Sequence, residues 1–111
     1  MDHDPLYLAG ILFFNRQDYF EAHEAWEDLW AAAAAPERRF YQGLIHAAVG
    51  LHHFSTGNLR GAAKLYRTCL DYLAPFPSPY LGLDTDDFRR QLGRCFAPVL
   101  AAAPGADTPG S

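Results

Sequence analysis

The stretch that decides the fold runs from residue 18 to residue 35 and reads DYFEAHEAWEDLWAAAAA. At roughly 100° per residue, the rotation of an α-helix, its large apolar side chains gather on one arc and most of its acids lie opposite. The apolar arc holds Tyr19, Ala22, Trp26, Leu29, Trp30 and Ala33, and the opposite side holds Glu21, Glu24 and Asp28. This pattern predicts an amphipathic helix with Asp18 as its N-cap and Glu21 completing a capping box.

Breaks on either side of this helix divide the rest of the chain into further helical segments. Pro36 suits the first turn of a helix, Gly57 the position just after a helix end, and Asn58 an N-cap. The sequence predicts helices over residues 6–14, from 18 to the alanines at 31–35, over 36–57 and 58–74, and from Asp84 or Thr85 to about residue 100. The predicted fold is an all-α, compact bundle of about five helices built from helical hairpins. We expect residues 1–101 to form a single domain and residues 102–111 to form a disordered tail.

An internal similarity links the first two predicted helices to the next two at an offset of 40 residues. The aligned residues are Phe14 with Phe54, Asp18 with Asn58 and Ala22 with Ala62. Such an offset is typical of stacked helical hairpins, but two unrelated turns of the same chemistry produce it too. The sequence leaves duplication and coincidence both open.

The composition excludes two classes of binding partner, nucleic acids and membranes. The 111 residues carry 13 Asp and Glu against 9 Lys and Arg, a formal charge of −4. This balance excludes the basic footprint of a nucleic-acid-binding domain, and no apolar run reaches the roughly 18 residues of a membrane span. We therefore expect neither nucleic acid nor a membrane as partner. The acidic start differs from a signal peptide, and Cys69 and Cys95 are too few for a disulfide framework, which predicts a cytoplasmic protein with reduced thiols.

Aromatic residues are numerous for so short a chain. There are 8 Phe, 6 Tyr and 2 Trp, more than a five-helix core obviously needs. An excess of this kind is typical of a chain that buries an aromatic patch against a partner. The sequence therefore predicts a homodimer.

Two of the predicted helices carry polar side chains beside their apolar arcs. His23 and Glu27 are four residues apart and therefore neighbours on the helix surface, at the edge of the aromatic arc. On the helix over 36–57 the polar residues form one stripe, which consists of Arg39, Gln42, His46 and His53. Since the two helices are joined by a short link and are expected to be antiparallel neighbours, we predict that His23, Glu27, Gln42, His46 and His53 converge.

Two glycines border the polar stripe. Gly43 and Gly50 lie inside a predicted helix, where each Gly costs about 1 kcal/mol relative to Ala. Close approach of another backbone or of a ligand would give a physical reason for both.

One long motif matches a known family. It consists of Phe14-Asn15, Tyr19-Phe20-Glu21-Ala22-His23-Glu24-x-Trp26-Glu27-x-x-Trp30, Gln42-Gly43-Leu44-Ile45, Gly57-Asn58 and Gly61-Ala62. Over about residues 10–73 the chain resembles the domain of unknown function family 309, a family of small bacterial and archaeal helical proteins. The resemblance implies an all-α bundle and no established activity. It highlights His23, Glu24, Glu27, Trp30 and Gln42.

Two functional interpretations remain open. The first is a ligand-binding or protein-interaction module with an unknown protein or small-molecule partner, in which the His/Glu/Gln cluster between the second and third helices is structural or receives that partner. The alternative is a metal-dependent, hydrolase-like enzyme in which His23, Glu27 and His46 hold a divalent transition metal as cofactor. The substitution Glu27→Gln separates them: a buried hydrogen-bonded pair predicts lost stability, and a metal site predicts lost metal with little change in folding. No catalytic residues are assigned.

Overall fold

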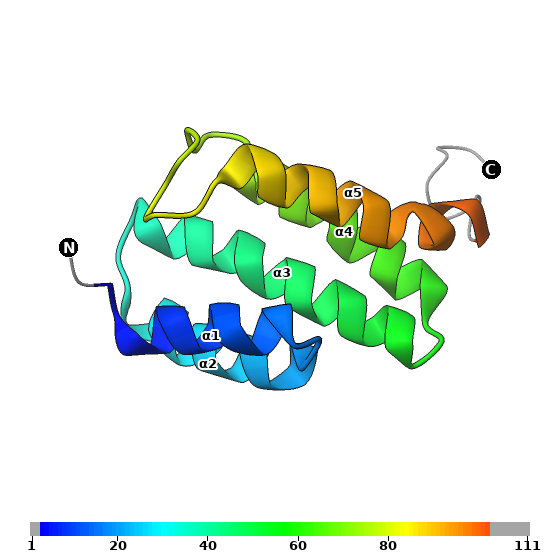
Figure 1. Cartoon of the computed structure of the whole chain (residues 1–111), viewed down its shortest axis with the longest axis horizontal. Coiled ribbons are helices and arrows are strands. Elements are labelled where there is room, and N and C mark those ends of the chain that lie inside the picture. Colours follow the sequence, from blue (N-terminus) through cyan, green and yellow to red (C-terminus); the bar gives the residue numbers. More distant parts are fainter. Residues whose placement is uncertain (1–2, 103–111) are drawn as a thin grey trace.

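The structure, a computed structural model, describes residues 3–102 and contains five helices within that range. These are α1 (Pro5–Asn15), α2 (Tyr19–Ala32), α3 (Glu37–Ser55), α4 (Leu59–Leu73) and α5 (Thr85–Ala102). The predicted all-α bundle is confirmed (Figure 1). Ala102, predicted as the first residue of the tail, closes α5, and residues 103–111 lie outside the described part of the chain.

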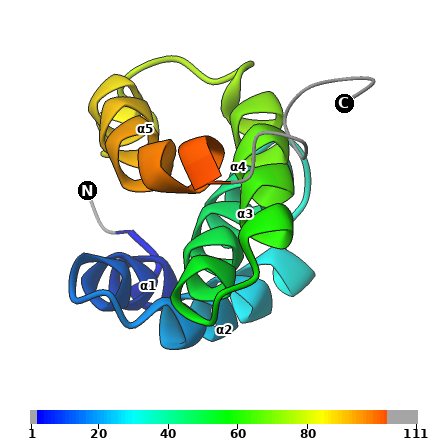
Figure 2. The same ribbon diagram turned by 90° about the vertical axis from the view of Figure 1, so that its right-hand side faces the viewer.

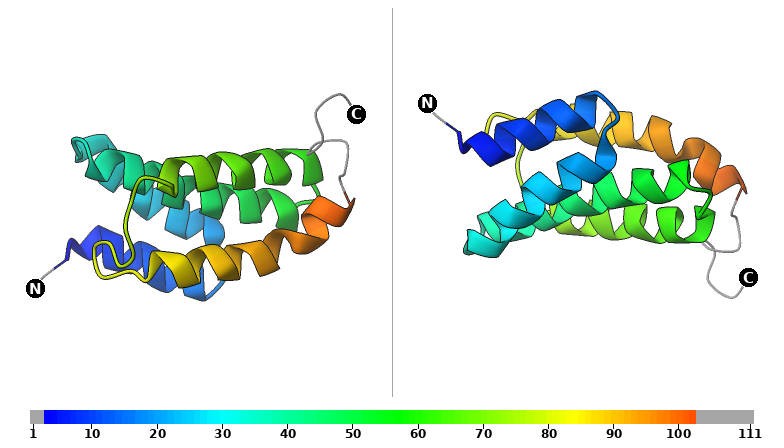
Figure 3. Two further views of the ribbon diagram at one scale, coloured as in Figure 1. Left: turned by 90° about the horizontal axis from the view of Figure 1, so that it is seen from above. Right: turned by 90° about the horizontal axis from the view of Figure 1, so that it is seen from below.

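The helices form two layers. α3 packs between α2 and α4, and these three lie side by side as one layer. α1 packs on α2, and α5 packs on α4 and α3. Figures 2 and 3 place α1 and α5 on the same side of the three-helix layer. Among the described residues no helix covers its other side, which we call the open face.

Trp26 ties the first hairpin to the core. Its side chain is 1% exposed, and its indole N–H donates to the main-chain oxygen of Tyr7 at 3.2 Å. The Tyr7 hydroxyl in turn donates to the main-chain oxygen of Leu81 at 3.0 Å. The ring of Phe14 packs against both Trp26 and Phe88 of α5. A helix and a loop far apart in sequence are thereby held over the same face of α3.

The turn between α1 and α2 and the turn between α3 and α4 have the same backbone geometry at residues 40 positions apart. Gln17 and Gly57 both have positive φ, 66° and 88°, the left-handed conformation that Gly adopts at no steric cost. The main-chain N–H of Asp18 bonds to the oxygen of Phe13, as that of Asn58 bonds to His53. The internal similarity therefore has the same backbone geometry in both turns.

The caps of the two hairpins differ. The Asn58 side chain accepts from the main-chain N–H of Gly61 at 3.0 Å, as predicted. Asp18 occupies the N-cap position of α2, but its side chain makes no capping hydrogen bond. The predicted capping box is wrong: the backbone at Asp18 (φ −88°, ψ 68°) is close to that at Asn58 (φ −86°, ψ 79°), and the difference lies in the side chain, which makes no capping bond at Asp18. Pro36, predicted to lie in the first turn of the helix, is instead the N-cap of α3, one residue before its first residue, Glu37.

Gly43 and Gly50 are explained by close approach of neighbouring side chains. A methyl group on Gly43 would lie 2.7 Å from Leu73 Cδ2, and one on Gly50 would lie 2.9 Å from Phe96 Cζ. Neither distance is tolerated between real carbon atoms without movement. The glycines thus let α4 and α5 pack tightly on α3, and no ligand is needed to account for them.

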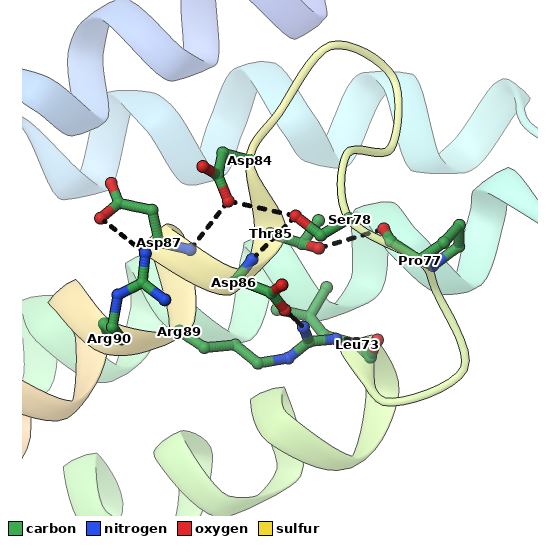
Figure 4. Close-up of polar contacts among 9 residues, drawn as sticks. All are labelled: Leu73, Pro77, Ser78, Asp84, Thr85, Asp86, Asp87, Arg89 and Arg90. Carbon is green, nitrogen blue, oxygen red and sulfur yellow. Dashed lines mark hydrogen bonds and ion pairs between the residues drawn. The ribbon is translucent and has the colours of Figure 1, made fainter.

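The segment before α5 is anchored by polar contacts (Figure 4). Asp84 accepts from the main-chain N–H of Asp87 at 3.0 Å and from the Ser78 hydroxyl at 3.1 Å. These hydrogen bonds lower the pKa of Asp84, the first being the larger cause. Arg89 donates to the main-chain oxygen of Leu73 at 2.7 Å, which binds α5 to the end of α4.

Candidate functional site

The predicted site residues lie along the open face and its seams. On α3, Leu44 and Leu51 are 1% and 4% exposed and point into the core. At about 100° per residue, the opposite side of α3 presents Gln42, His46 and His53. All three are half-buried. The polar stripe predicted from the sequence is therefore the ridge of the open face.

His23 and Glu27 form a pair on α2. The His23 Nε2–H donates to Glu27 Oε2 at 2.9 Å, and the two side chains are 24% and 56% exposed. Water reaches both groups, so the pair differs from the buried, desolvated pair considered from the sequence. Such exposed pairs contribute about 0–1 kcal/mol.

A shallow hollow lies beside His23, between α2 and α3. It has a volume of about 160 Å³ and is lined mainly by apolar surface of Tyr19, Phe20, His23, Val49 and His52. Phe20 is 48% exposed, and its ring lies 6.0 Å from the ring of His23 and 5.8 Å from that of His52. An aromatic side chain is thus held in place at the surface by two imidazoles.

Trp30 and Glu24 occupy different surroundings on α2. Trp30 is half-buried at the seam with α3, and the Arg38 guanidinium lies 4.1 Å from its ring centroid. This geometry is a cation–π contact that holds the start of α3 against α2. Glu24 is exposed, as the helical wheel predicts.

Gln42 and His46 belong to a hydrogen-bonded chain that joins α3 to α4. The Thr68 hydroxyl donates to the main-chain oxygen of Leu65 at 3.1 Å. Its oxygen therefore accepts from His46 Nδ1–H, at 2.7 Å. The Gln42 amide donates to His46 Nε2 at 2.7 Å. With one nitrogen donating and the other accepting, His46 is neutral. Burial lowers its pKa, which favours the same state.

No hydrogen bond between the described residues joins the two predicted polar pairs. His23 pairs with Glu27 within α2, and His46 bonds to Gln42 within α3 and to Thr68 of α4. His53 lies near the C-terminal end of α3, where Asn58 Nδ2 donates to its Nδ1 at 3.4 Å. The residues share one face and not one cluster.

The metal-ligand set His23, Glu27 and His46 is not assembled. Within residues 3–102, no three or more His, Cys, Asp or Glu side chains are grouped so that they could hold an ion. The physical reason is rotational: His46 faces α4, and both of its ring nitrogens already bond to Gln42 and Thr68.

The open face also includes Arg39, Thr68 and Tyr72. Thr68 and Tyr72 were not predicted as site residues from the sequence. Tyr72 packs edge-on against His46 with ring centroids 5.0 Å apart, and Arg39 lies 5.0 Å from the Tyr72 ring centroid. Arg39 also donates to the main-chain oxygen of Asp71 at 3.0 Å. The helical wheel of α4 places Thr68 on the same face as charged residues. Its hydroxyl on that face was the one sequence feature that could have indicated a polar contact with α3.

Comparison with known proteins finds relatives without an assigned activity. A family model described as "Domain of unknown function (DUF309)" matches residues 7–65. An uncharacterized protein of Aquifex aeolicus strain VF5 is 32% identical over 80 residues, which are 71% of this chain and 24% of that protein. The uncharacterized protein YpuF of Bacillus subtilis strain 168 is 39% identical over 56 residues, which are 50% of this chain and 32% of YpuF. The chain thus spans only a quarter to a third of the length of these curated relatives.

A solved structure shares the fold. The crystal structure of a conserved hypothetical protein of Thermus thermophilus, TTHA0068, superposes with a TM-score of 0.76 at 27% identity. The match covers 86% of this chain and 99% of that one. Among the described residues, no helix is both long enough and apolar enough to cross a membrane.

Proposed function

The chain belongs to the DUF309 family, whose model matches residues 7–65 of its 111, and from this membership and the geometry of the open face we propose that it is a protein-interaction module. The open face of the α2–α3–α4 layer is the binding surface. The hollow around Phe20 is the centre of that surface.

The observation that carries the proposal is the exposure of Phe20. A ring that is 48% exposed yet held between His23 and His52 gains little for folding. Interfaces between proteins place aromatic anchors of this kind inside a polar rim. Here Glu24 and Glu27 supply one side of the rim, and both are exposed. An apolar side chain of a partner could therefore pack against Phe20 in the hollow, with polar groups around the contact.

The size of the hollow favours a macromolecular partner over a small molecule. Its volume is about 160 Å³, whereas pockets that enclose a drug-sized ligand measure roughly 300–1,000 Å³. A protein partner needs only a shallow surface. In the two curated relatives the matched segment makes up only 24% and 32% of the protein, as a module within a larger chain would, whereas the match covers 99% of the solved Thermus thermophilus chain. No comparable observation favours the hydrolase interpretation.

Site-specific photo-crosslinking tests the proposal. A photoactivatable phenylalanine analogue replaces Phe20 in one variant and Leu12 in the control, since Leu12 is 50% exposed and lies on α1, outside the open face. We expect irradiation of cells to give a discrete protein adduct from position 20 that position 12 does not give. Adding Glu27→Arg to the position-20 variant should remove the adduct. Identical adducts from both positions, or none from position 20, would overturn the proposal.

A further inference from the structure

The two edges of the open face carry opposite charge. α2 contains Glu21, Glu24, Glu27 and Asp28 and no Lys or Arg. α4 contains Arg60, Lys64 and Arg67 with Asp71 as its one acid. Between them, the α3 ridge is formed by Gln42, His46, Val49 and His53, and the cation Arg39 lies at its start, beside Asp71 of α4. The face therefore runs from an acidic edge on α2 to a basic edge on α4.

These charges point toward the open side of each helix. On α2, Glu24 lies about 160° around the helix from the buried Trp26, and Glu27 about 100°. On α4, Lys64 lies about 140° from the buried Cys69. Glu24, Glu27 and Lys64 are exposed. All three are therefore available to a molecule that lies on this face.

The acidic and basic groups also lie at the same level along α3. His23 shares its hollow with Val49 of α3. On the other flank, a methyl group on Gly50 would lie 3.3 Å from Leu65 Cβ. Val49 and Gly50 are consecutive, so His23 of α2 and Leu65 of α4 lie at the same height along α3. Glu24 is next to His23 in the sequence and Lys64 is next to Leu65. Glu24 and Lys64 therefore lie opposite each other across the ridge.

A face of this kind is complementary to itself in one orientation only. A two-fold axis parallel to α3 sets α2 of one copy against α4 of the other, so acid meets base along both edges. A two-fold axis perpendicular to α3 within the interface sets α2 against α2, where like charges repel. Charge thus selects a dimer whose α3 helices run parallel.

We infer that the partner of the open face is a second copy of this chain, bound about a two-fold axis parallel to α3 with Glu24 and Glu27 facing Arg60 and Lys64 of the other copy. This inference rests on the proposed function and names its partner. The α3 ridge forms the centre of the contact, and Phe20 lies beside it on the α2 edge.

The available area is adequate for a specific dimer. The 14 to 19 residues of α2, α3 and α4 correspond to lengths of about 21–28 Å. Three helices spaced about 8–10 Å apart span a width of roughly 25–30 Å. The face therefore offers on the order of 500–800 Å² per copy, close to the roughly 800 Å² per partner of a standard interface.

Charge reversal tests the inference. One variant carries Glu24→Lys and Glu27→Lys, which makes both edges basic, and the other carries Arg60→Glu and Lys64→Glu, which makes both acidic. The control carries Arg90→Glu and Arg94→Glu on α5, the same charge change as in the second variant, at exposed residues outside the open face. Sedimentation equilibrium measures self-association at low and high salt, and circular dichroism verifies folding.

We expect the unmodified chain and the control to dimerise, and each open-face variant to lose self-association at least tenfold. An equimolar mixture of the two variants should form a one-to-one heterodimer, because each edge then meets its opposite charge, and salt should weaken it. A monomeric unmodified chain, or variants that dimerise like the control, would overturn the inference. Loss of the dimer only on Leu8→Ser with Leu12→Ser would assign the contact to α1 instead.

The crosslinking result separates the two proposals. An adduct between position 20 and another protein, together with a monomeric chain in solution, would leave the proposed function standing and remove the second copy as its partner. Absence of both the adduct and the dimer would remove both.

Discussion

Replacing Thr68 by Val tests the hydrogen-bonded chain between α3 and α4. The Thr68 hydroxyl donates to Leu65 and so accepts from His46 Nδ1–H, at 2.7 Å. Valine has nearly the same shape but no acceptor, so the imidazole N–H loses its partner. An unsatisfied buried donor costs about 1–3 kcal/mol. Because His46 is half-buried and water reaches part of the ring, we expect the lower half of that range, about 1–2 kcal/mol.

Urea and thermal unfolding measure this loss. For a domain of about 100 residues, 1 kcal/mol corresponds to about 4–8 °C in Tm, so we expect Tm to fall by about 5–15 °C. The matched control is Thr56→Val, because the Thr56 hydroxyl is exposed and bonds only to the main-chain oxygen of His53. The control should lose less than about 0.5 kcal/mol.

The ¹⁵N chemical shifts of the His46 ring provide a second readout. They should show the proton on Nδ1 in the unmodified chain and a shift toward the Nε2 tautomer in Thr68→Val. An Nε2 proton in the unmodified chain, or equal unfolding midpoints for Thr68→Val and Thr56→Val, would refute the reasoning.

Three further predictions follow from the described contacts. Asn58→Ala should cost about 1 kcal/mol in urea unfolding because it removes a capping bond, and Asp18→Ala should cost clearly less because its side chain caps nothing; equal losses would contradict this. Glu27→Gln should change the free energy of unfolding by less than about 1 kcal/mol, since the pair with His23 is exposed; a larger loss would show that the pair is buried in solution. Because burial lowers the pKa of His46 in the folded chain, the unfolded chain takes up a proton first as pH falls through about 6.5. The stability advantage over His46→Gln should therefore be complete near pH 7.5 and shrink as the pH falls to 5.5; an advantage that grows on acidification would be decisive against a neutral, half-buried His46.

The helices were predictable because each depends on local interactions. The arc that contains Trp26 and Leu29, both buried in the structure, is already visible at 18–35. The positive φ of Gly57 and the cap at Asn58 follow from residue types that favour those conformations. Asp18 shows the limit of such rules, because it has the residue type of an N-cap and nearly the backbone of Asn58, and yet its side chain makes no capping bond.

The candidate site was predictable one helix at a time. Separate helical wheels placed His23 beside Glu27 and Gln42 beside His46, and both pairs are hydrogen-bonded in the structure. A helical wheel describes one helix alone and does not give the rotation of that helix about its axis relative to its neighbour. For that reason the wheels could not decide whether the two pairs meet, and in the structure no hydrogen bond between the described residues joins one pair to the other.

The sequence by itself determined five helices, their turns and the polar side chains that each presents, since these depend on residues three or four apart. Only the tertiary structure decided that His46 turns toward Thr68 of α4, that Phe20 stays exposed beside His23, and that acidic and basic edges flank one face. The physical reason is that α4 and α5 pack against α3 at Gly43 and Gly50, where the absence of side chains admits Leu73 and Phe96. That close approach sets the rotation of α3, and the rotation decides which polar groups meet.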